Sequence, residues 1–239
     1  MSLRAKLMSV IIILGILLIL VSTCFMFNYN RKILIQDTLK NNNDTSFAIS
    51  INIDNYLSEL ANTVTTLASA PCLKEYILDN TQRLDLLTEQ EIEDRFRELN
   101  DRWMSTDDIE DPFIEKYLSN TMAEFLKSQM EVIPDLYGEI FLTDKYGELL
   151  ATTEKLTTFT HESKGWWLSA YNDGKGRVHF DDRGYDDSVG DFVLGVVAPV
   201  YSQDEVVGIL KCNMKIFSLF DEVIRNYLPL YEPGEVRIV

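Results

Sequence analysis

The sequence is short of the residues and motifs that most enzyme active sites require. It has only two histidines, His161 and His179. An H-E-x-x-H zinc signature, a G-x-S-x-G nucleophile elbow and a glycine-rich phosphate-binding loop are all absent from it. A triad of Ser163, His161 and an aspartate can be drawn on paper, yet no spacing singles it out. We therefore expect no catalytic residue and no cofactor in this chain.

Cysteine is also scarce, with Cys24, Cys72 and Cys212 as the full set. No two of them form a C-x-x-C pair or another metal-ligand spacing, so we expect no metal site. Cys24 lies in an apolar run, Cys72 in a helical stretch and Cys212 in a strand pattern. A disulfide between Cys72 and Cys212 stays open on the sequence alone, and separate buried thiols are the favoured interpretation.

Basic residues are few, and they are unevenly placed. The chain has 22 Lys and Arg against 38 Asp and Glu, a net charge of −16. Residues 1–32 hold four of the basic residues and no acidic one, which leaves 18 basic against 38 acidic side chains, or −20, beyond them. The negative electrostatic field of these residues repels nucleic acid, so we expect no nucleic-acid partner.

One long apolar run is present, from Leu7 to Phe27, with 21 residues and no charge. This length suits a bilayer core of roughly 30 Å and exceeds the apolar region of a cleaved signal peptide. A lipoprotein acylated on Cys24 is the rival interpretation, and Thr23 before that cysteine fits it poorly. We predict a single-pass inner-membrane anchor, with residues 33–239 periplasmic or extracellular.

Helical patterns fill residues 33–132. A stripe of apolar side chains at steps of three and four predicts a long helix over about 33–69: Ile49, Ile53, Leu57, Leu60, Val64 and Leu67. This stripe is compatible with packing of the helix on the domain that follows in the chain. It is equally compatible with pairing with the same helix of a second copy. Thr88 with Glu91 predicts a capping box, and Asp111 before Pro112 opens a helix through about Met130. We expect the acidic run 107–111 to be a solvated loop.

Glycine is almost missing until the composition changes at residue 138, since Gly15 alone of 11 glycines comes earlier. From there, strand formers alternate with turn formers. The segment 138–153 predicts a hairpin whose turn, 144–147, ends at a left-handed glycine. The β-rich segments 192–201 and 205–216 predict further strands. From Val206 to Met214 every second residue is apolar, and we expect these side chains to face the core. A helix over 216–227 follows.

Together these patterns predict an α+β fold. An N-terminal transmembrane helix leads into a long helix and a helical segment, followed by a module with an antiparallel sheet of about five strands. We expect the long helix on one face of this sheet and the segment carrying Trp166 and Trp167 over the other.

The ordered strings GEIFLTDKYGELLATT, KGWWLSAY, GRVHFDD, DDSVG, VLGVVAPVY and EVVGILKCNMKIFSLF resemble the Cache family, in particular the membrane-distal half of a double Cache domain. These are PAS-like extracytoplasmic sensors of bacterial and archaeal receptors. The resemblance divides the chain into a cytoplasmic N-terminus (1–6), a transmembrane helix (7–27), a long signalling helix with a helical region (33–132), a PAS-like ligand-binding module (137–227) and the start of a truncated second module (228–239).

The resemblance also implies where a ligand binds. Family members that bind amino acids carry an Arg-x-Trp-Tyr signature, and this sequence has Lys164, Trp166 and Trp167 at the matching place, with Tyr171 following. Lysine lacks the bidentate fork of arginine, which weakens the expectation of α-amino-acid specificity. We expect one tryptophan ring in the core and one lining a pocket; two packing rings are the alternative.

A loop at 181–191 is the second part of the expected site. Its candidate ligand contacts are Arg183, Tyr185, Asp186 and Asp187, one of the last two facing a ligand ammonium. A Ca²⁺-like cation or a plain solvated acidic loop are the alternatives.

The function implied by the resemblance is extracytoplasmic ligand sensing for a histidine kinase, chemoreceptor or diguanylate cyclase. The expected ligand is a small amino acid, amine or carboxylate, and the expected assembly is a homodimer at the membrane. The output domain, a kinase or cyclase, is expected outside this chain, which is itself not an enzyme. A membrane-tethered protein-interaction domain without a small-molecule ligand is the alternative.

Overall fold

A computed structural model of the chain describes residues 3–133, 136–186 and 191–215. It divides into two compact units, Met1–Asn52 and Ile53–Val239. The elements in chain order are α1 (Leu3–Ala68), α2 (Pro71–Thr81), the short 3₁₀ helix η1 (Leu84–Leu86), α3 (Glu89–Met104), α4 (Pro112–Leu118), α5 (Thr121–Val132), β1 (Tyr137–Asp144), β2 (Leu149–Thr152), α6 (Gly165–Tyr171), β3 (His179–Asp186), β4 (Asp191–Ser202) and β5 (Glu205–Lys215).

The first unit consists of helix α1 up to Asn52. Within the described residues this helix is long and apolar enough to cross a membrane, with a mean hydropathy of 3.0 in its most apolar window and none of that window buried. The finding fits the anchor predicted at 7–27. Helix α1 is continuous from Leu3 to Ala68, so no break separates the predicted span from the predicted long helix.

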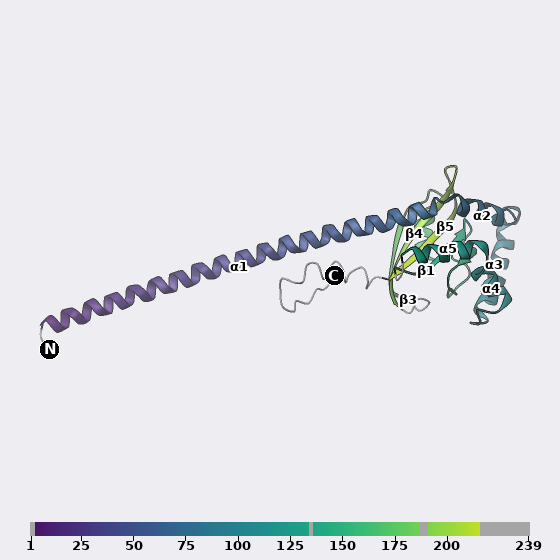
Figure 1. Ribbon diagram of the computed structural model, residues 1–239. Helices are drawn as coiled ribbons and strands as arrows, with labels where there is room; N and C mark the ends of the chain where they lie inside the picture. The colour runs from purple at the N-terminus through teal and green to yellow at the C-terminus, as the bar shows by residue number, and fades with distance from the viewer. Residues whose placement is uncertain (1–2, 134–135, 187–190, 216–239) are drawn as a thin grey trace. The chain divides into compact units, whose positions relative to one another are not determined.

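The second unit is built on an antiparallel sheet of five strands in the order β2-β1-β5-β4-β3 (Figure 1). This confirms the predicted α+β class and strand number. The β1–β2 turn is also as predicted, because Gly147 has a φ of +91° and donates its N–H to Asp144 O at 3.2 Å. A Cβ at Gly147 would lie 2.5 Å from the backbone nitrogen of Glu162, so both conformation and space require glycine there.

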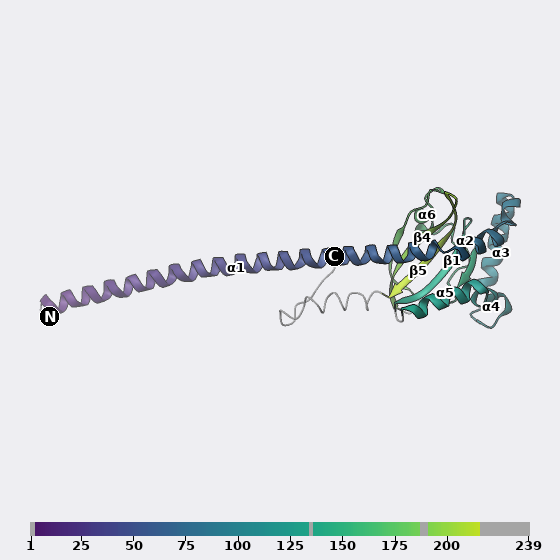
Figure 2. The same ribbon diagram turned by 45° about the horizontal axis from the view of Figure 1, so that its top comes forward.

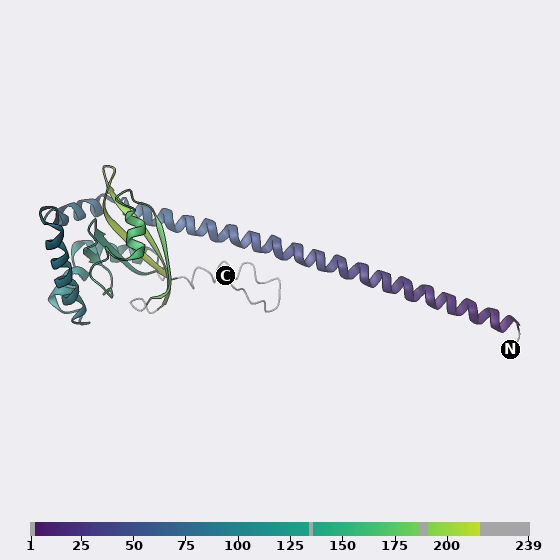
Figure 3. The same ribbon diagram turned by 180° about the vertical axis from the view of Figure 1, so that it is seen from behind.

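Both faces of the sheet are buried, and each has its own apolar cluster. Side chains of α1, α2 and α5, among them Val64, Ile77 and Leu126, pack on one face against strand residues such as Leu210. Side chains of α3, α4 and α6 pack on the other face against Phe141, Val197 and Ile209. Figure 1 shows the side covered by α5, and Figure 3 the side covered by α6. The predicted placement of the long helix and the tryptophan segment on opposite faces is therefore confirmed.

The stripe on the long helix becomes buried toward its C-terminal end. Leu60 is 4% exposed and Val64 fully buried, whereas Ile49, Ile53 and Leu57 are half-buried. Packing against the domain thus accounts for the last two turns of the stripe.

Two boundaries differ from the predicted ones. The helix expected from Pro112 to about Met130 is two helices, because Asn120 leaves the helical conformation and its side chain accepts the N–H of Ala123 as the cap of α5. The loop expected at 181–191 is strand at both of its ends, since residues 181–186 belong to β3 and Asp191 begins β4, while residues 187–190 lie outside the described chain. In β3, pairing with β4 continues past an irregularity between Asp181 and Gly184, and Gly184 has a φ of +79°.

Helix α3 begins with the predicted capping box. The hydroxyl of Thr88 accepts the N–H of Glu91 at 3.4 Å, and the carboxylate of Glu91 accepts the N–H of Thr88 at 2.8 Å. We expect Thr88→Ala to lower the free energy of unfolding by about 1 kcal/mol, because the N–H of Glu91 loses its acceptor and the Glu91 carboxylate loses its hydrogen bond from the hydroxyl.

Thermal unfolding measures this effect as a fall in Tm of about 2–4 °C. The matched control is Thr121→Ala at an exposed position in the first turn of α5, which should change stability by less than about 0.5 kcal/mol. Equal effects of the two substitutions would contradict the role given to the capping box.

Candidate functional site

Helix α6 is a seven-residue helix that packs on one face of the sheet, next to β4 (Figure 2). It begins after Lys164, whose N–H donates to His161 O at 2.9 Å and whose ψ of 134° marks the turn into the helix. It ends at Asn172, which adopts the left-handed conformation with a φ of 50°. Of the predicted contacts, this short helix carries Trp166, Trp167 and Tyr171, and Lys164 lies directly before it as the N-cap residue.

Both tryptophan rings are buried, Trp166 at 4% and Trp167 at 3% exposure. Trp166 packs edge-on against Phe141, with ring centroids 5.7 Å apart, and against His161 at 5.4 Å. Trp167 stacks on Tyr171 at 4.8 Å and donates its Nε1–H to the hydroxyl of Thr143 at 3.1 Å. Neither ring is exposed, because both lie on the side of α6 that faces β1 and the segment before the helix, whereas Leu168 on the outer side is 54% exposed.

A charged pair lies directly under Trp166. Lys211 on β5 is 3% exposed, and its Nζ donates to Asp181 Oδ2 of β3 at 2.6 Å. The same Nζ lies 4.4 Å from the centroid of the Trp166 ring and 6.0 Å from that of Phe141, which is cation–π geometry. The sequence alternation had placed Lys211 opposite the apolar set of its strand, and the covering by α6 turns that position into a buried one.

Gly195 on β4, which pairs with β3 and β5, leaves room for this pair. A Cβ there would lie 2.8 Å from Lys211 Cε and 3.0 Å from Asp181 Cβ. Any larger residue at 195 would therefore have to push the lysine and the aspartate aside. The glycine is part of the site through the space it leaves open.

Two more buried polar side chains continue the row along the sheet. Asn213, two residues beyond Lys211 on β5, donates its Nδ2–H to Glu139 Oε1 of β1 at 2.7 Å, and each of the two residues is 2% exposed. We call Glu139, Asp181, Lys211 and Asn213 the polar row. It combines one cationic and two anionic side chains beneath an aromatic ring, and none of its members was among the predicted site residues.

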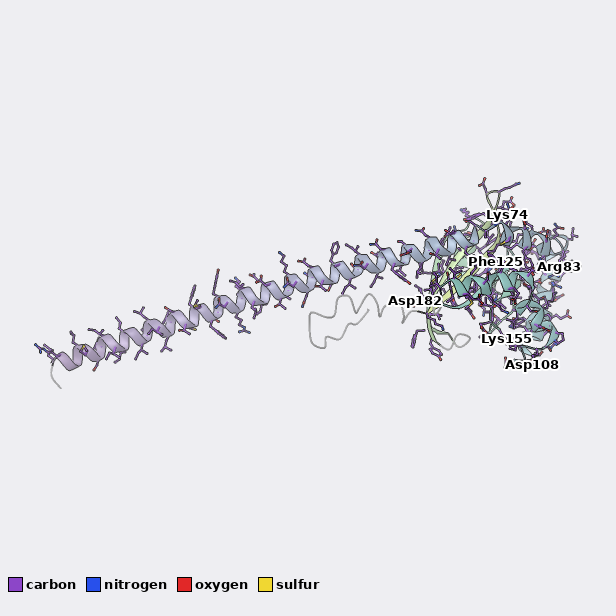
Figure 4. All side chains as sticks on the ribbon, in the orientation of Figure 1. Lys74, Arg83, Asp108, Phe125, Lys155 and Asp182 are labelled. Carbon is purple, nitrogen blue, oxygen red and sulfur yellow. The ribbon has the colours of Figure 1, made fainter. Side chains whose placement is uncertain are left out.

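The remaining predicted contacts lie on β3 and after it. Tyr185 is 54% exposed and packs edge-on against Phe192 of β4, with centroids 5.5 Å apart. Arg183 and Asp186 belong to β3, and their side chains, like all of Asp187, lie outside the described residues. Of the predicted acidic segment, the structure places Asp181 at the polar row, while Asp182 is exposed at the β3 edge (Figure 4).

A second buried charged cluster lies at the β1–β2 turn. The fully buried carboxylate of Glu148 accepts two hydrogen bonds from Arg95, at 2.9 and 3.0 Å, and one from Arg83 at 2.5 Å. Asp144, also fully buried, accepts the N–H groups of Tyr146 and Glu148 on Oδ1, each at 2.9 Å. Burial, followed by the nearby charge of Glu148, raises the pKa of Asp144 to about 7.

The described residues offer no cluster that could bind a metal ion and no reactive buried thiol. Among residues 3–133, 136–186 and 191–215, no three His, Cys, Asp or Glu side chains lie close enough to hold a metal ion. Cys24, Cys72 and Cys212 are all free, as predicted, but the prediction that they are buried is right for Cys212 and wrong for Cys24 and Cys72, which are exposed. Burial raises the pKa of the Cys212 thiol, so this thiol is unreactive at neutral pH.

No protein-family model and no curated protein match this chain. Among solved structures, the sensor domain of the Vibrio cholerae histidine kinase DctB is 15% identical, with a TM-score of 0.49, and the match covers 82% of this chain and 61% of that one. The ligand-binding domain of the Campylobacter jejuni chemoreceptor Tlp3, in complex with L-norvaline, is 16% identical with a TM-score of 0.47, covering 80% of this chain and 63% of that one.

A third similar structure is the Escherichia coli DcuS sensor domain, 15% identical with a TM-score of 0.33, where the match covers 55% of this chain and 93% of that one. This chain thus spans about three fifths of the length of the DctB and Tlp3 domains. The similar solved structures thus include sensor domains of histidine kinases and ligand-binding domains of chemoreceptors.

Proposed function

We propose that this chain is the extracytoplasmic ligand-sensing region of a membrane-anchored signalling receptor. The observation that carries the proposal is the polar row on the sheet beneath Trp166. Buried charges cost more to desolvate than an apolar core of the same shape, so a purely structural core gains little from Lys211 and Asp181. A binding site for a small polar molecule does gain from them, because it needs a few placed charges within aromatic walls.

The ligand class follows from the charges in the row. The ammonium of Lys211 is complementary to a ligand carboxylate, while Asp181 and Glu139 are complementary to a ligand amine. The face of Trp166 adds a contact for a cation, worth about 0.5–2 kcal/mol. We therefore infer that the ligand is an amino acid, an amine or a carboxylate. Such a ligand would replace hydrogen bonds between the side chains of the polar row with hydrogen bonds to its own charged groups.

The signal would leave the module through helix α1. Leu60, Val64 and Ala68 at its C-terminal end belong to the same core as the strands β1, β4 and β5. If the sheet has two arrangements, a ligand that binds one of them more tightly shifts the equilibrium toward it. The shift in the equilibrium constant is at most the ratio of the ligand's affinities for the two arrangements. Pairing of two copies along α1 at the inner membrane, with residues 33–239 outside the cytoplasm, would pass this shift to the membrane span.

The test is thermal unfolding of the full chain in detergent micelles with a panel of amino acids, amines, carboxylates and divalent cations. A ligand at about 100 times its Kd should raise Tm by roughly 5–10 °C. We expect Lys211→Met to abolish the response and Lys175→Met, at an exposed lysine, to leave it intact. A panel that never raises Tm, or a Lys211→Met variant that responds like the native chain, would refute the proposal.

A protein-interaction domain is the second candidate, and a different observation favours it. Leucine side chains are exposed around η1, with Leu86 at 86%, Leu78 at 38% and Leu87 at 37% exposure. Grouped exposed leucines are typical of surfaces that bind another protein. A flat thermal-shift panel, combined with saturable binding of a partner protein that is lost in Leu86→Ser, would support this candidate instead.

A further inference from the structure

Asp144, at the end of β1, is a fully buried carboxyl group with one oxygen left unpaired. Its Oδ1 accepts the N–H groups of Tyr146 and Glu148, each at 2.9 Å. Its Oδ2 is buried and has no hydrogen-bond partner among the residues that the structure describes. A buried carboxylate oxygen without a donor is costly, whereas a protonated oxygen carries no charge. The β1–β2 turn is therefore arranged for the neutral form of this side chain.

The charged groups around this carboxyl group also favour its neutral form. Glu148, four residues further on, is a second fully buried carboxylate. The guanidinium groups of Arg83 and Arg95 both donate to Glu148, and Lys145 of the turn pairs with Asp85 at 2.7 Å. The nearest cations are therefore bonded to other carboxylates.

The other surroundings of the turn come from α2, α4 and the segment before α6. On the α2 side, Ile77 lies over Gly208, the β5 partner of Asp144. The remaining titratable side chains next to the turn are Tyr146 within it, Tyr117 of α4, and His161 and Glu162 before α6. Burial raises the pKa of Tyr117 to about 12, so Tyr117 is neutral at pH 7. Because histidine ordinarily titrates near pH 6.5, a test of Asp144 has to separate it from His161.

Backbone hydrogen bonds join the turn to helix α6. Gly147 O accepts the N–H of His161 at 3.0 Å, and His161 O accepts the N–H of Lys164, the N-cap residue of α6, at 2.9 Å. Glu162 packs so closely on Gly147 that a Cβ there would collide with its backbone. A displacement of the turn therefore has to move the residues that begin α6.

A second connection leads from the end of β1 to the same helix. The hydroxyl of Thr143 accepts the Nε1–H of Trp167 at 3.1 Å. The ring of His161 lies 5.4 Å from that of Trp166, which in turn covers the ammonium of Lys211 at 4.4 Å. The position of the β1–β2 turn thus decides how closely α6 covers the polar row.

We propose that loss of the proton from Asp144 loosens the β1–β2 turn and, through it, the cover of α6 over the polar row, so that pH is a second input to this module. The ionised carboxylate repels that of Glu148, and movement of the turn relieves this repulsion at the expense of the bond between Gly147 and His161. Burial and the charge of Glu148 raise the pKa of Asp144 to about 7, so both forms are populated near neutral pH.

The sign of the effect follows from proton linkage. The closed arrangement of the turn holds the proton more tightly than a loosened one, so it is favoured at low pH and lost as pH rises through the midpoint. The proposal does not depend on a ligand. If the polar row binds one as proposed above, its affinity changes with pH in the same window.

Fluorine NMR of the full chain in detergent micelles, with 5-fluorotryptophan in place of tryptophan, tests the coupling without a ligand. The three tryptophans give three resonances, which Trp→Phe substitutions assign. We expect the Trp166 resonance to shift along a single titration curve with its midpoint at about pH 7. Asp144→Asn should hold this resonance at its low-pH position from about pH 5 to 9. The matched control is Asp101→Asn, at an exposed position on α3, and it should titrate like the native chain.

Two results would overturn the proposal. One is a Trp166 resonance that does not titrate in the native chain, a measurement that needs no variant. The other is a titration that persists in Asp144→Asn, because the neighbouring His161 would then be the titrating group. If Asp144→Asn fails to fold, Arg83→Gln takes its place: loss of one cation from the cluster should raise the midpoint, and an unchanged midpoint would count against the proposal. A thermal-shift panel that finds no ligand leaves these outcomes unaffected.

Discussion

Replacing Glu148 with glutamine is expected to lower the free energy of unfolding by about 3 kcal/mol. The carboxylate is fully buried, and both of its oxygens accept hydrogen bonds from the guanidinium of Arg95, which also raises the pKa of Arg95. Arg83 adds a third bond from the segment before α3. Glutamine keeps the volume but removes the charge and one acceptor oxygen, so two arginines lose the partner that holds the turn against α3.

Denaturant unfolding of the native chain and the variant measures this loss. The matched control is Glu124→Gln, whose carboxylate is 61% exposed and pairs with Lys127 at the surface of α5, and it should change stability by less than about 0.5 kcal/mol. Arg95→Met should lower the free energy of unfolding more than Arg83→Met does. Arg95 donates two hydrogen bonds to Glu148 and its side chain is 29% exposed, against 49% for that of Arg83. A Glu148→Gln effect as small as the control would contradict the role assigned to this cluster.

Asp144→Asn is expected to stabilise the protein at pH 8, by about 4 kcal/mol at most. Burial and the charge of Glu148 raise the pKa of Asp144 to about 7 in the folded chain, above its ordinary value of 3.8. Between pH 4 and 7 the folded state holds a proton that the unfolded state has released, so stability falls as pH rises through this window. The asparagine keeps Oδ1 as acceptor for Tyr146 and Glu148 and carries no charge.

The measurement is the free energy of unfolding of both chains at several values between pH 4 and 8. The advantage of the asparagine variant should be small near pH 4, grow up to about pH 7 and stay level above it. Asp182→Asn, at an exposed position on β3, is the control and should show no such trend. A stability difference that is the same at every pH would mean that Asp144 does not titrate in this window.

The elements that depend on local chemistry could be predicted from the sequence. The capping box at Thr88, the left-handed Gly147 and the two-residue alternation of β5 each follow from side chains within a few positions of one another. Spacing of apolar residues likewise predicted a helix that ends near Pro71 and the five-stranded antiparallel sheet. The break at Asn120 escaped prediction, because the apolar spacing continues across it and only its cap to Ala123 reveals it.

The candidate site was predicted in part. Trp166 and Trp167 could be singled out from their neighbours in sequence, but the four residues of the polar row could not. Lys211 and Asn213 alternate with apolar residues on β5, a pattern that is typical of a strand with one solvent-facing side. Whether that side is exposed depends on α6 and α3, which lie some 40 and 110 residues earlier in the chain.

The sequence by itself determined the acidic outer region, the apolar run of 21 residues, most of the helices and strands and the side of β5 on which Lys211 lies. Only the tertiary structure decided that this side is covered, that Asp181 meets Lys211 across β4, and that Glu148 joins two arginines from separate segments. The physical reason is that periodicity records the direction of a side chain, whereas burial and pairing depend on elements brought together by long-range packing.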